Sequence, residues 1–188
     1  KSPGTKLFSV SGDVNKPGVI EVPLGTPLKD IIEVHCGGMR DGKALKAVIP
    51  GGSSCPIFDA KTSYEAKMDY EDIASKGSML GSGAIIVLNE TRNMGEVLKW
   101  TLEFYHHESC AQCTPCREGT GWIESIFKRR DKNIAQKSDI DLLDKAAASM
   151  RGGQTICALA EAAAMPTQGM IKVFRNELED YITAPNKK

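Results

Sequence analysis

The chain has 188 residues, of which 41% are hydrophobic and 26% are charged. This composition is ordinary for one or two globular domains and far from that of a disordered chain. The 24 Lys and Arg residues balance the 24 Asp and Glu residues, which excludes a chain-wide basic field for nucleic acid. No stretch approaches the roughly 18 consecutive apolar residues of a membrane span.

The first 90 residues predict a small, mostly β domain. Strands are predicted at 6–11, 19–22, 46–49 and 84–88. The first two are joined through a Pro-Gly turn signal at 17–18, which is typical of a hairpin. Thr26 resembles an N-cap before Pro27, so a helix is predicted to follow. Residues 61–83 are predicted as a loop with one short helix, and the order of elements favours an α+β sheet of the β-grasp kind.

The second half predicts an all-α bundle. Helices are predicted around 97–105, at 117–130, at 138–150, at 157–164 and at 168–181. Ser138 and Asp141 resemble a capping pair, and Pro166 is predicted to end one helix before the next begins. Trp100 and Trp122 are predicted to lie in the bundle core. The predicted organisation is a β-grasp domain at 1–90, a helical bundle at 91–183 and a flexible tail at 184–188.

Four of the six cysteines are candidates for chemistry. Cys110, Cys113 and Cys116 fall within seven residues. Three separate disulfides are hard to build from such a run, because each has its own distance and dihedral requirements. Three thiolates can, in contrast, turn toward one metal centre. Cys157 is predicted to open a later helix, which can meet the cysteine run in a compact bundle.

Three close cysteines and a remote fourth form the ligand pattern of a 4Fe-4S cluster. Cys116 is predicted to precede a helix directly, so that the positive helix end faces the anionic centre. Arg117 adds a full positive charge as an electrostatic neighbour of that centre. A structural zinc site is the alternative, although zinc ligands usually come as two separated pairs.

The other candidate groups have plainer interpretations. Cys36 and Cys55 stand alone and are predicted to be buried as small hydrophobes. The pair His106-His107 is predicted to lie at the surface or beside the ligands rather than to bind metal. No glycine motif for phosphate binding, no Ser/His/Asp order and no H-E-x-x-H motif is present. The visible chemistry is therefore the storage and transfer of electrons.

Residues 108–119 (ESCAQCTPCREG) resemble the E-S-C-G-x-C-x-P-C-R-x-G signature of the NADH-binding flavoprotein of respiratory complex I, its 51 kDa or F subunit. Residues 155–159 (TICAL) resemble the segment that carries the fourth cluster ligand of that family. Residues 12–18 and 47–54 resemble its β-grasp (SLBB) domain. Related diaphorase subunits of NAD-linked hydrogenases and formate dehydrogenases share these modules, and the resemblance covers nearly the whole chain.

The resemblance implies an electron-transfer module of an NADH:quinone oxidoreductase-type complex. It implies that a 4Fe-4S cluster is bound by Cys110, Cys113, Cys116 and Cys157. In the family, NADH reduces FMN, and the cluster then passes electrons one at a time to clusters in neighbouring subunits. The flavin and NADH sites belong to a larger N-terminal domain that is absent here. The chain, which begins at Lys1, is therefore expected to be a fragment or a split subunit that does not oxidise NADH alone.

The expected partners are the flavin- and NADH-binding domain and other iron–sulfur subunits, without nucleic acid and without a direct membrane span. The expected location is the peripheral arm of a membrane complex, on the cytoplasmic or mitochondrial matrix side. Two alternatives stand beside this interpretation. One is a zinc-stapled docking module without redox activity, and the other is the same electron-transfer module in an NAD-linked hydrogenase or formate dehydrogenase.

Four positions depart from the family pattern. Ala111 replaces the glycine that is usual between the first two ligands. If that position needs a positive φ, alanine there costs on the order of 1 kcal/mol. Gln154, Glu161 and Met165 stand where histidine, aspartate and tryptophan are common. These departures concern the cluster's potential and its partner contacts, rather than the four ligands.

Overall fold

The computed structural model describes residues 2–185. The chain divides into two compact units, Lys1–Arg92 and Asn93–Lys188. We call them the sheet unit and the helical unit and describe each by itself. The first contains a five-stranded mixed sheet and the described part of the second is all helical, so the predicted α+β class is confirmed. Within residues 2–185, no helix is both long and apolar enough to cross a bilayer.

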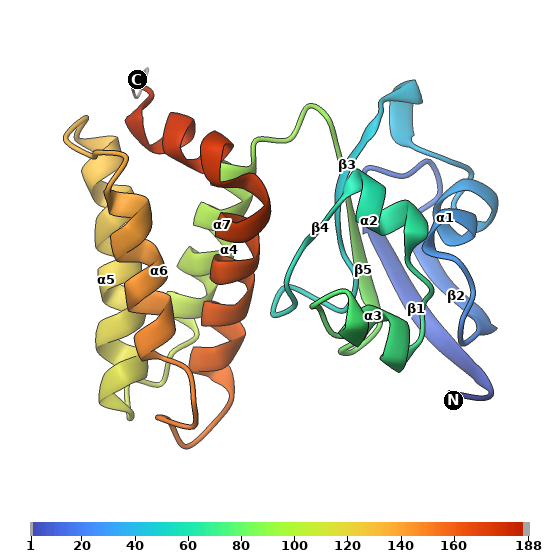
Figure 1. The fold of residues 1–188 in the computed structure, drawn as a ribbon, viewed down its shortest axis with the longest axis horizontal. Helices are drawn as coiled ribbons and strands as arrows, with labels where there is room; N and C mark the ends of the chain where they lie inside the picture. The colour runs from blue at the N-terminus through green and yellow to red at the C-terminus, as the bar shows by residue number, and fades with distance from the viewer. Residues whose placement is uncertain (1, 186–188) are drawn as a thin grey trace. The chain divides into compact units, whose positions relative to one another are not determined.

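The sheet has the strand order β2-β1-β5-β3-β4. Its strands are β1 (Thr5–Gly12), β2 (Gly18–Pro23), β3 (Leu45–Ile49), β4 (Phe58–Asp59) and β5 (Ala84–Asn89). The pair β1–β2 is the predicted antiparallel hairpin, and β5 pairs in parallel with β1 and antiparallel with β3 (Figure 1). The last strand in the sequence, β5, therefore lies at the centre of the sheet, in agreement with the expected β-grasp arrangement.

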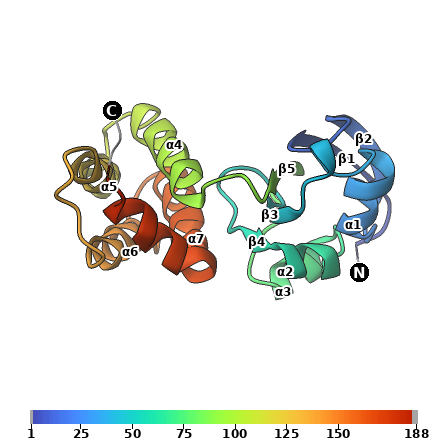
Figure 2. The same ribbon diagram turned by 90° about the horizontal axis from the view of Figure 1, so that it is seen from above.

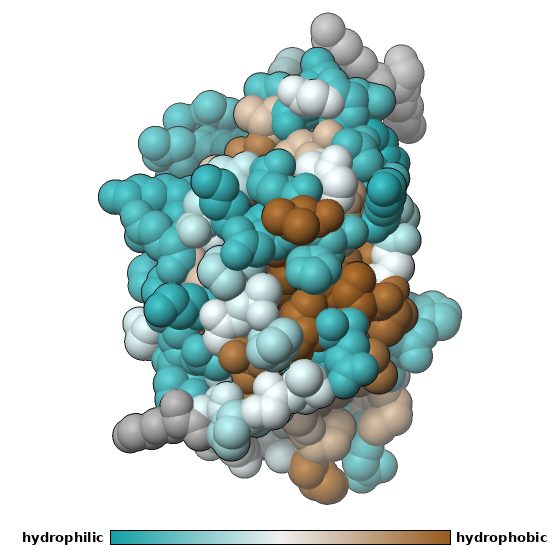
Figure 3. Space-filling model, turned by 90° about the vertical axis from the view of Figure 1, so that its right-hand side faces the viewer, coloured by the Kyte–Doolittle hydropathy of each residue, from teal (hydrophilic) through white to brown (hydrophobic). Residues whose placement is uncertain are grey.

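One face of the sheet carries the core of this unit. Phe8 and Val10 on β1 are buried, whereas the adjacent Leu7 on the other face is 62% exposed, because side chains alternate between the two faces of a strand. Short helices cover the buried face (Figure 2). They are α1 (Leu28–Asp30), the π-helical turn Ile31–His35, α2 (Ala60–Glu65) and α3 (Tyr70–Ser75). Figure 3 shows apolar side chains on the surface of the sheet unit, and Leu7, Val19 and Val34 are among its exposed large hydrophobic residues.

Local predictions in this unit needed two corrections. Thr26 does not cap the first helix, because its hydroxyl donates to the Pro23 carbonyl instead. Residues 61–83 hold two helices rather than one, and their N-caps are Asp59 and Asp69, whose carboxylates accept backbone N–H bonds at 2.7 Å. The capping aspartates were the overlooked signals in this segment.

The described part of the helical unit consists of four helices whose neighbours pack in a ring: α4 against α5, α5 against α6, α6 against α7 and α7 against α4 (Figures 1 and 2). They are α4 (Met94–His107), α5 (Thr114–Asp131), α6 (Asp139–Ser149) and α7 (Leu159–Thr183). Asn93 caps α4 by accepting bonds from two backbone N–H groups. At Gly95 a side chain would collide with Tyr181, because an added Cβ would lie 2.2 Å from the ring. Helices α4 and α7 therefore approach closely at this point.

Several helix predictions were wrong in detail. Helix α7 is continuous through Pro166, although proline removes one helical hydrogen bond. The surrounding residues Ala163, Ala164 and Thr167 are all buried, and this packing outweighs the lost bond. Ser138 makes no capping bond, and the carboxylate of Asp139 accepts from the backbone N–H of Gln136 instead.

The two tryptophans are the clearest misplacements. Trp100 is 58% exposed and Trp122 is 55% exposed, so neither belongs to the bundle core. Apolar residues at helical spacing mark a face, but they do not say how far the core extends around the helix. Of the flexible tail predicted at 184–188, residues 186–188 lie outside the described residues.

Candidate metal centre

The first three candidate ligands lie where α4 passes into α5. Helix α5 begins at Thr114, three residues earlier than predicted, so Cys116 lies inside its first turn and does not precede it. Cys113 is the N-cap residue and Cys110 lies in the connecting loop. Cys116 is buried, Cys113 is partly buried and Cys110 is exposed. The exposure of the three thiols therefore increases from Cys116 in the helix to Cys110 in the loop.

The turn between the first two cysteines adopts a left-handed conformation at Ala111, where φ is +60°. This is the conformation that glycine takes without strain. Hydrogen bonds hold the turn on both sides. The Ala111 N–H donates to the Ser109 hydroxyl at 3.2 Å, and the Arg117 Nη1 donates to the Ala111 carbonyl at 3.0 Å. Arg117 also pairs with Glu118 and does not line the pocket described below. Its direct effect is therefore to fasten the loop.

Ser109 was not identified from the sequence as a site residue. Its hydroxyl accepts from Ala111 and lies 3.3 Å from the Cys116 sulfur. Since the oxygen already accepts a bond from the backbone, its own proton is available to the Cys116 sulfur. Hydrogen bonds to ligand sulfurs are one of the ways in which a protein adjusts an iron–sulfur centre.

The fourth candidate, Cys157, lies in the loop between α6 and α7. We call residues 151–158 the Cys157 loop. Helix α7 begins only at Leu159, so Cys157 precedes the helix that it was predicted to open. The Ile156 N–H donates to the Cys113 sulfur at 3.4 Å. This bond joins the Cys157 loop to the cysteine run.

The four thiols share one pocket. It has a volume of about 160 Å³ and is lined by Glu108, Cys110, Gln112, Cys113, Cys116, Thr155, Cys157 and Leu159. The structure therefore brings together the four cysteines that the sequence singled out. Cys36 and Cys55 are buried in the sheet unit, as predicted, and burial raises the pKa of both thiols.

Four thiol sulfurs around one pocket are the donor set of a 4Fe-4S cluster. A tetrahedral zinc ion needs its thiolate ligands about 2.3 Å from a single point. Among residues 2–185, no three His, Cys, Asp or Glu side chains are arranged to hold a single metal ion. Cys116 lies in the first turn of α5, so the positive end of the helix dipole is beside it and favours an anionic centre.

The two histidines beside the cysteine run do not line this pocket. The His106 Nδ1 lies 3.0 Å from the Thr120 hydroxyl, and its Nε2 lies 3.6 Å from a Glu124 carboxylate oxygen. His107 contacts the neighbouring Glu108 at the surface. That neither histidine binds metal stays a prediction.

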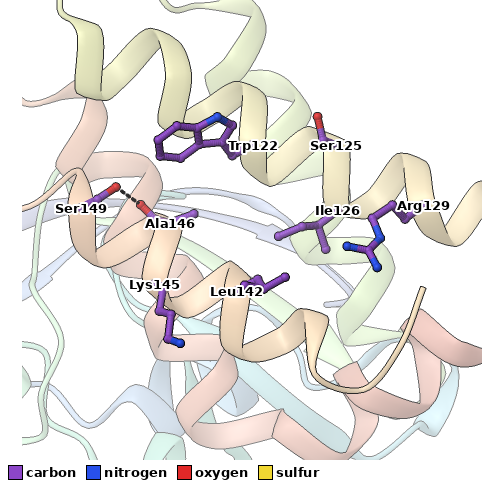
Figure 4. A pocket seen from close by; sticks show the side chains of 8 residues that line it. All are labelled: Trp122, Ser125, Ile126, Arg129, Leu142, Lys145, Ala146 and Ser149. Carbon is purple, nitrogen blue, oxygen red and sulfur yellow. Dashed lines mark hydrogen bonds between the residues drawn. The ribbon is translucent and has the colours of Figure 1, made fainter. Parts of the chain in front are cut away.

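A second, larger hollow of the helical unit lies between α5 and α6. It has a volume of about 380 Å³, and Trp122, Ile126 and Leu142 contribute its apolar surface (Figure 4). Trp122 faces this hollow from α5, and Leu142 faces it from α6. None of its lining residues is a cysteine or a histidine. Trp122 therefore lines this hollow instead of the bundle core. The hollow shares no lining residue with the thiol pocket.

Comparison with known proteins assigns both units. Residues 6–87 match the SLBB domain family, and residues 96–181 match the NADH-ubiquinone oxidoreductase-F iron-sulfur binding region. The chain is 49% identical over 180 residues to the F subunit of NADH-quinone oxidoreductase from Rickettsia bellii. It is 45% identical over 183 residues to mitochondrial NADH dehydrogenase (ubiquinone) flavoprotein 1 of Dictyostelium discoideum. These alignments cover 95% and 97% of this chain, but 43% and 38% of the relatives.

Solved structures agree with this assignment. An NAD+-reducing [NiFe]-hydrogenase in the air-oxidized state matches with a TM-score of 0.84 and 29% identity, over 100% of this chain and 31% of the hydrogenase chain. The chain spans less than half the length of each of these relatives. The chain therefore corresponds to the SLBB domain and the iron–sulfur binding region of NADH-quinone oxidoreductase F subunits.

Proposed function

We propose that the chain is an electron-transfer module in which Cys110, Cys113, Cys116 and Cys157 hold a 4Fe-4S cluster. The observation that carries the proposal is the single pocket lined by all four thiols. These thiols come from two segments that lie far apart in the sequence, one at the start of α5 and one after α6. A centre that needs four thiolates around one object accounts for that convergence.

When bound, a 4Fe-4S cluster supplies reversible storage of one electron. The protein groups around the pocket prepare the site for that charge. The Ser109 hydroxyl and the Ile156 N–H reach the sulfurs of Cys116 and Cys113. Both can donate to a thiolate, and such donors favour the more negative, reduced state. Arg117 fixes the turn at Ala111, which keeps Cys110 beside the helix end.

The role of the whole protein follows from the family. We propose that electrons reach this module from FMN, which is reduced by NADH on a domain outside this chain. They leave through iron–sulfur clusters of neighbouring subunits in the peripheral arm of a membrane complex, which faces the cytoplasm or the mitochondrial matrix. On this basis the chain alone binds a cluster but does not oxidise NADH. Turnover of NADH with a dye acceptor by the purified chain would contradict this part of the proposal.

The decisive experiment is anaerobic purification of the chain with analysis of iron, zinc and acid-labile sulfide, together with visible spectra before and after dithionite. The expected result is about four iron and four sulfide per chain, with bleaching on reduction. One zinc per chain without visible colour would replace the proposal with a zinc-stapled docking module.

Two cysteine variants assign the ligands. Cys157→Ala is expected to lose most of the iron, because one corner of the cluster loses its thiolate. Cys55→Ala is the matched control, since Cys55 is buried in the sheet unit outside the pocket. An unchanged EPR spectrum of the reduced cluster in Cys157→Ala would remove Cys157 from the ligand set.

A further inference from the structure

The Cys157 loop reaches the thiol pocket with almost no help from burial. Seven of its eight residues are exposed, and Thr155 is the single partly buried one. Ile156, the large apolar residue beside the cysteine, is 87% exposed. Apolar burial is the usual way to fix a segment in a folded protein. Since the loop lacks it, hydrogen bonds must determine where Cys157 lies.

Two of the hydrogen bonds end on one carboxylate. Beside them are a bond from Arg151 to Gln168, one from the Thr155 hydroxyl to the Cys157 carbonyl, and the Ile156 bond to Cys113. The Glu161 Oε1 accepts from the Gly152 N–H at 3.0 Å and from the Gly153 N–H at 3.3 Å. Glu161 belongs to the first turn of α7 and is partly buried. The carboxylate therefore ties the start of the Cys157 loop to the first turn of the helix that follows the loop.

The two glycines have the backbone conformation that this arrangement requires. Gly152 and Gly153 have φ values of +79° and +73°, a region that other residues rarely adopt. Consecutive N–H groups in such turns can form a small concavity that binds an anion. Here the anion is a side chain of the protein itself. Bonds to a charged acceptor are also stronger than bonds between neutral groups.

We propose that Glu161 is the positioning residue for the fourth cluster ligand: it closes the Cys157 loop through Gly152 and Gly153 and so holds Cys157 at the thiol pocket. This inference rests on the proposed function, because it assumes that Cys157 is a ligand. Glu161 does not line the pocket itself. It acts through the loop.

The test compares three variants of the reconstituted chain. Glu161→Ala removes both bonds, whereas Glu161→Gln keeps a side-chain oxygen that can accept them. Glu96→Ala is the matched control, since Glu96 is an exposed glutamate in the first turn of α4 and its loss affects a helix end in the same way. The measurements are the rate at which iron passes to an added chelator and the EPR spectrum of the reduced cluster.

Glu161→Ala is expected to release iron about tenfold faster than wild type and to change the EPR line shape, as the loss of two bonds to a charged acceptor predicts. Glu161→Gln is expected to stay within about threefold of wild type, because neutral hydrogen bonds retain part of the constraint. Glu96→Ala is expected to match wild type. Wild-type iron release and an unchanged spectrum in Glu161→Ala would overturn the inference.

A second variant keeps the test independent of any folding defect in Glu161→Ala. Gly152→Ala leaves the carboxylate in place, and its added Cβ meets no atom within 4 Å, but the left-handed backbone at that position is strained. It is expected to release iron faster than wild type while the iron-free protein keeps its helix content. Iron release at the wild-type rate from a folded Gly152→Ala protein would also count against the inference. If wild type itself takes up no cluster, the proposed function fails; if wild type loads normally and both loop variants behave like it, only the role of Glu161 fails.

Discussion

Both units of this chain bury a carboxylate that pairs with an arginine, Asp13 with Arg92 in the sheet unit and Asp139 with Arg129 in the helical unit. The carboxylate of Asp13 is 2% exposed and accepts bonds from Arg92 and from the backbone N–H of Asn89.

The two units differ in the exposure of their thiols, because Cys36 and Cys55 of the sheet unit are buried. The sheet unit fills its core with large aliphatic and aromatic side chains from strands and short helices. The helical unit leaves two of its four pocket thiols, Cys110 and Cys157, exposed at the surface.

Close glycine contacts occur in both units, but their partners differ. In the sheet unit, an added Cβ would meet backbone atoms at Gly12, Gly51 or Gly81. In the helical unit, Gly95 and Gly119 let neighbouring helices approach so closely that an added Cβ would collide with Tyr181 or Met150. The comparison teaches that the sheet unit encloses its two thiols in its core, whereas the helical unit combines tight helix contacts with a partly exposed thiol site held by local hydrogen bonds.

The largest expected effect lies in the sheet unit. Asp13→Asn removes the charge that pairs with Arg92 and turns an amide donor toward that guanidinium. Asp13 is buried, although Arg92 is half exposed. Removing a buried carboxylate that accepts three hydrogen bonds is expected to cost about 3 kcal/mol of unfolding free energy, to be measured by denaturant unfolding. Asp141→Asn in the helical unit is the control, because its pair with Arg175 lies at the surface and exposed pairs contribute little. Equal effects of the two changes would break the comparison.

The same pair predicts a pH dependence. The hydrogen bond from Arg92 lowers the pKa of Asp13. A carboxyl whose pKa is lower in the folded state contributes stability that is fully present above its unfolded pKa, about 3.9. That contribution is lost as the pH falls through the lower folded pKa. The stability advantage of wild type over Asp13→Asn is therefore expected to shrink below about pH 4, and an advantage that grows there would contradict the assignment.

The next effect tests close packing in the helical unit. In Gly95→Ala, the new Cβ would lie 2.2 Å from the Tyr181 ring and 2.7 Å from the Tyr181 Cβ, so a rotation of the ring cannot relieve the clash. Overpacking of this kind costs about 2–3 kcal/mol. Gly121→Ala on α5 is the matched control, since its nearest atom is at 3.8 Å, and it is expected to gain about 1 kcal/mol from helix propensity. Thermal unfolding of the iron-free chain measures both, and equal stabilities would refute the close contact.

A smaller effect concerns the turn between the first two cysteines. Ala111→Gly relieves a left-handed alanine, and the iron-free protein is expected to gain about 1 kcal/mol in unfolding free energy. Iron content should stay at the wild-type level, because the Arg117 and Ser109 bonds to this residue use only its backbone. Destabilisation by glycine would mean that the turn does not have this conformation in solution.

The smallest expected change in unfolding free energy distinguishes the cysteine run from the Cys157 loop. Cys113 is the N-cap of α5 but makes no capping bond with its side chain. Serine is a preferred N-cap, so Cys113→Ser is expected to stabilise the iron-free chain by about 0.5 kcal/mol. The same variant is expected to bind no cluster. Cys157→Ser should lose the cluster without any such gain, since Cys157 lies in an exposed loop before α7. Iron analysis and unfolding of the iron-free proteins check both halves of this prediction, and a gain from both changes would contradict it.

Much of the fold could be predicted because local patterns specify it. The alternation around Phe8 and Val10 marks a strand with one buried face, and the turn at 17–18 fixes the hairpin. The errors arose where tertiary contacts outweigh a local rule. Burial of the residues around Pro166 keeps α7 helical at that point, and the helix is interrupted instead at Phe174, whose φ is −123°. The exposed Trp122 shows that helical spacing does not measure the width of a core.

For the candidate site, the sequence by itself determined the four thiols and their number, because the spacing of Cys110, Cys113 and Cys116 and the presence of a remote Cys157 are properties of the chain. Only the tertiary structure decided which groups surround those thiols. Ser109 at the Cys116 sulfur is a short-range contact that depends on the turn at Ala111. Glu161 at Gly152 and Gly153 depends on how the loop folds back on α7. The physical reason is that a thiol can bind metal because of its own chemical nature, which the sequence states. A hydrogen bond forms only if the fold brings a donor and an acceptor to the right distance and angle.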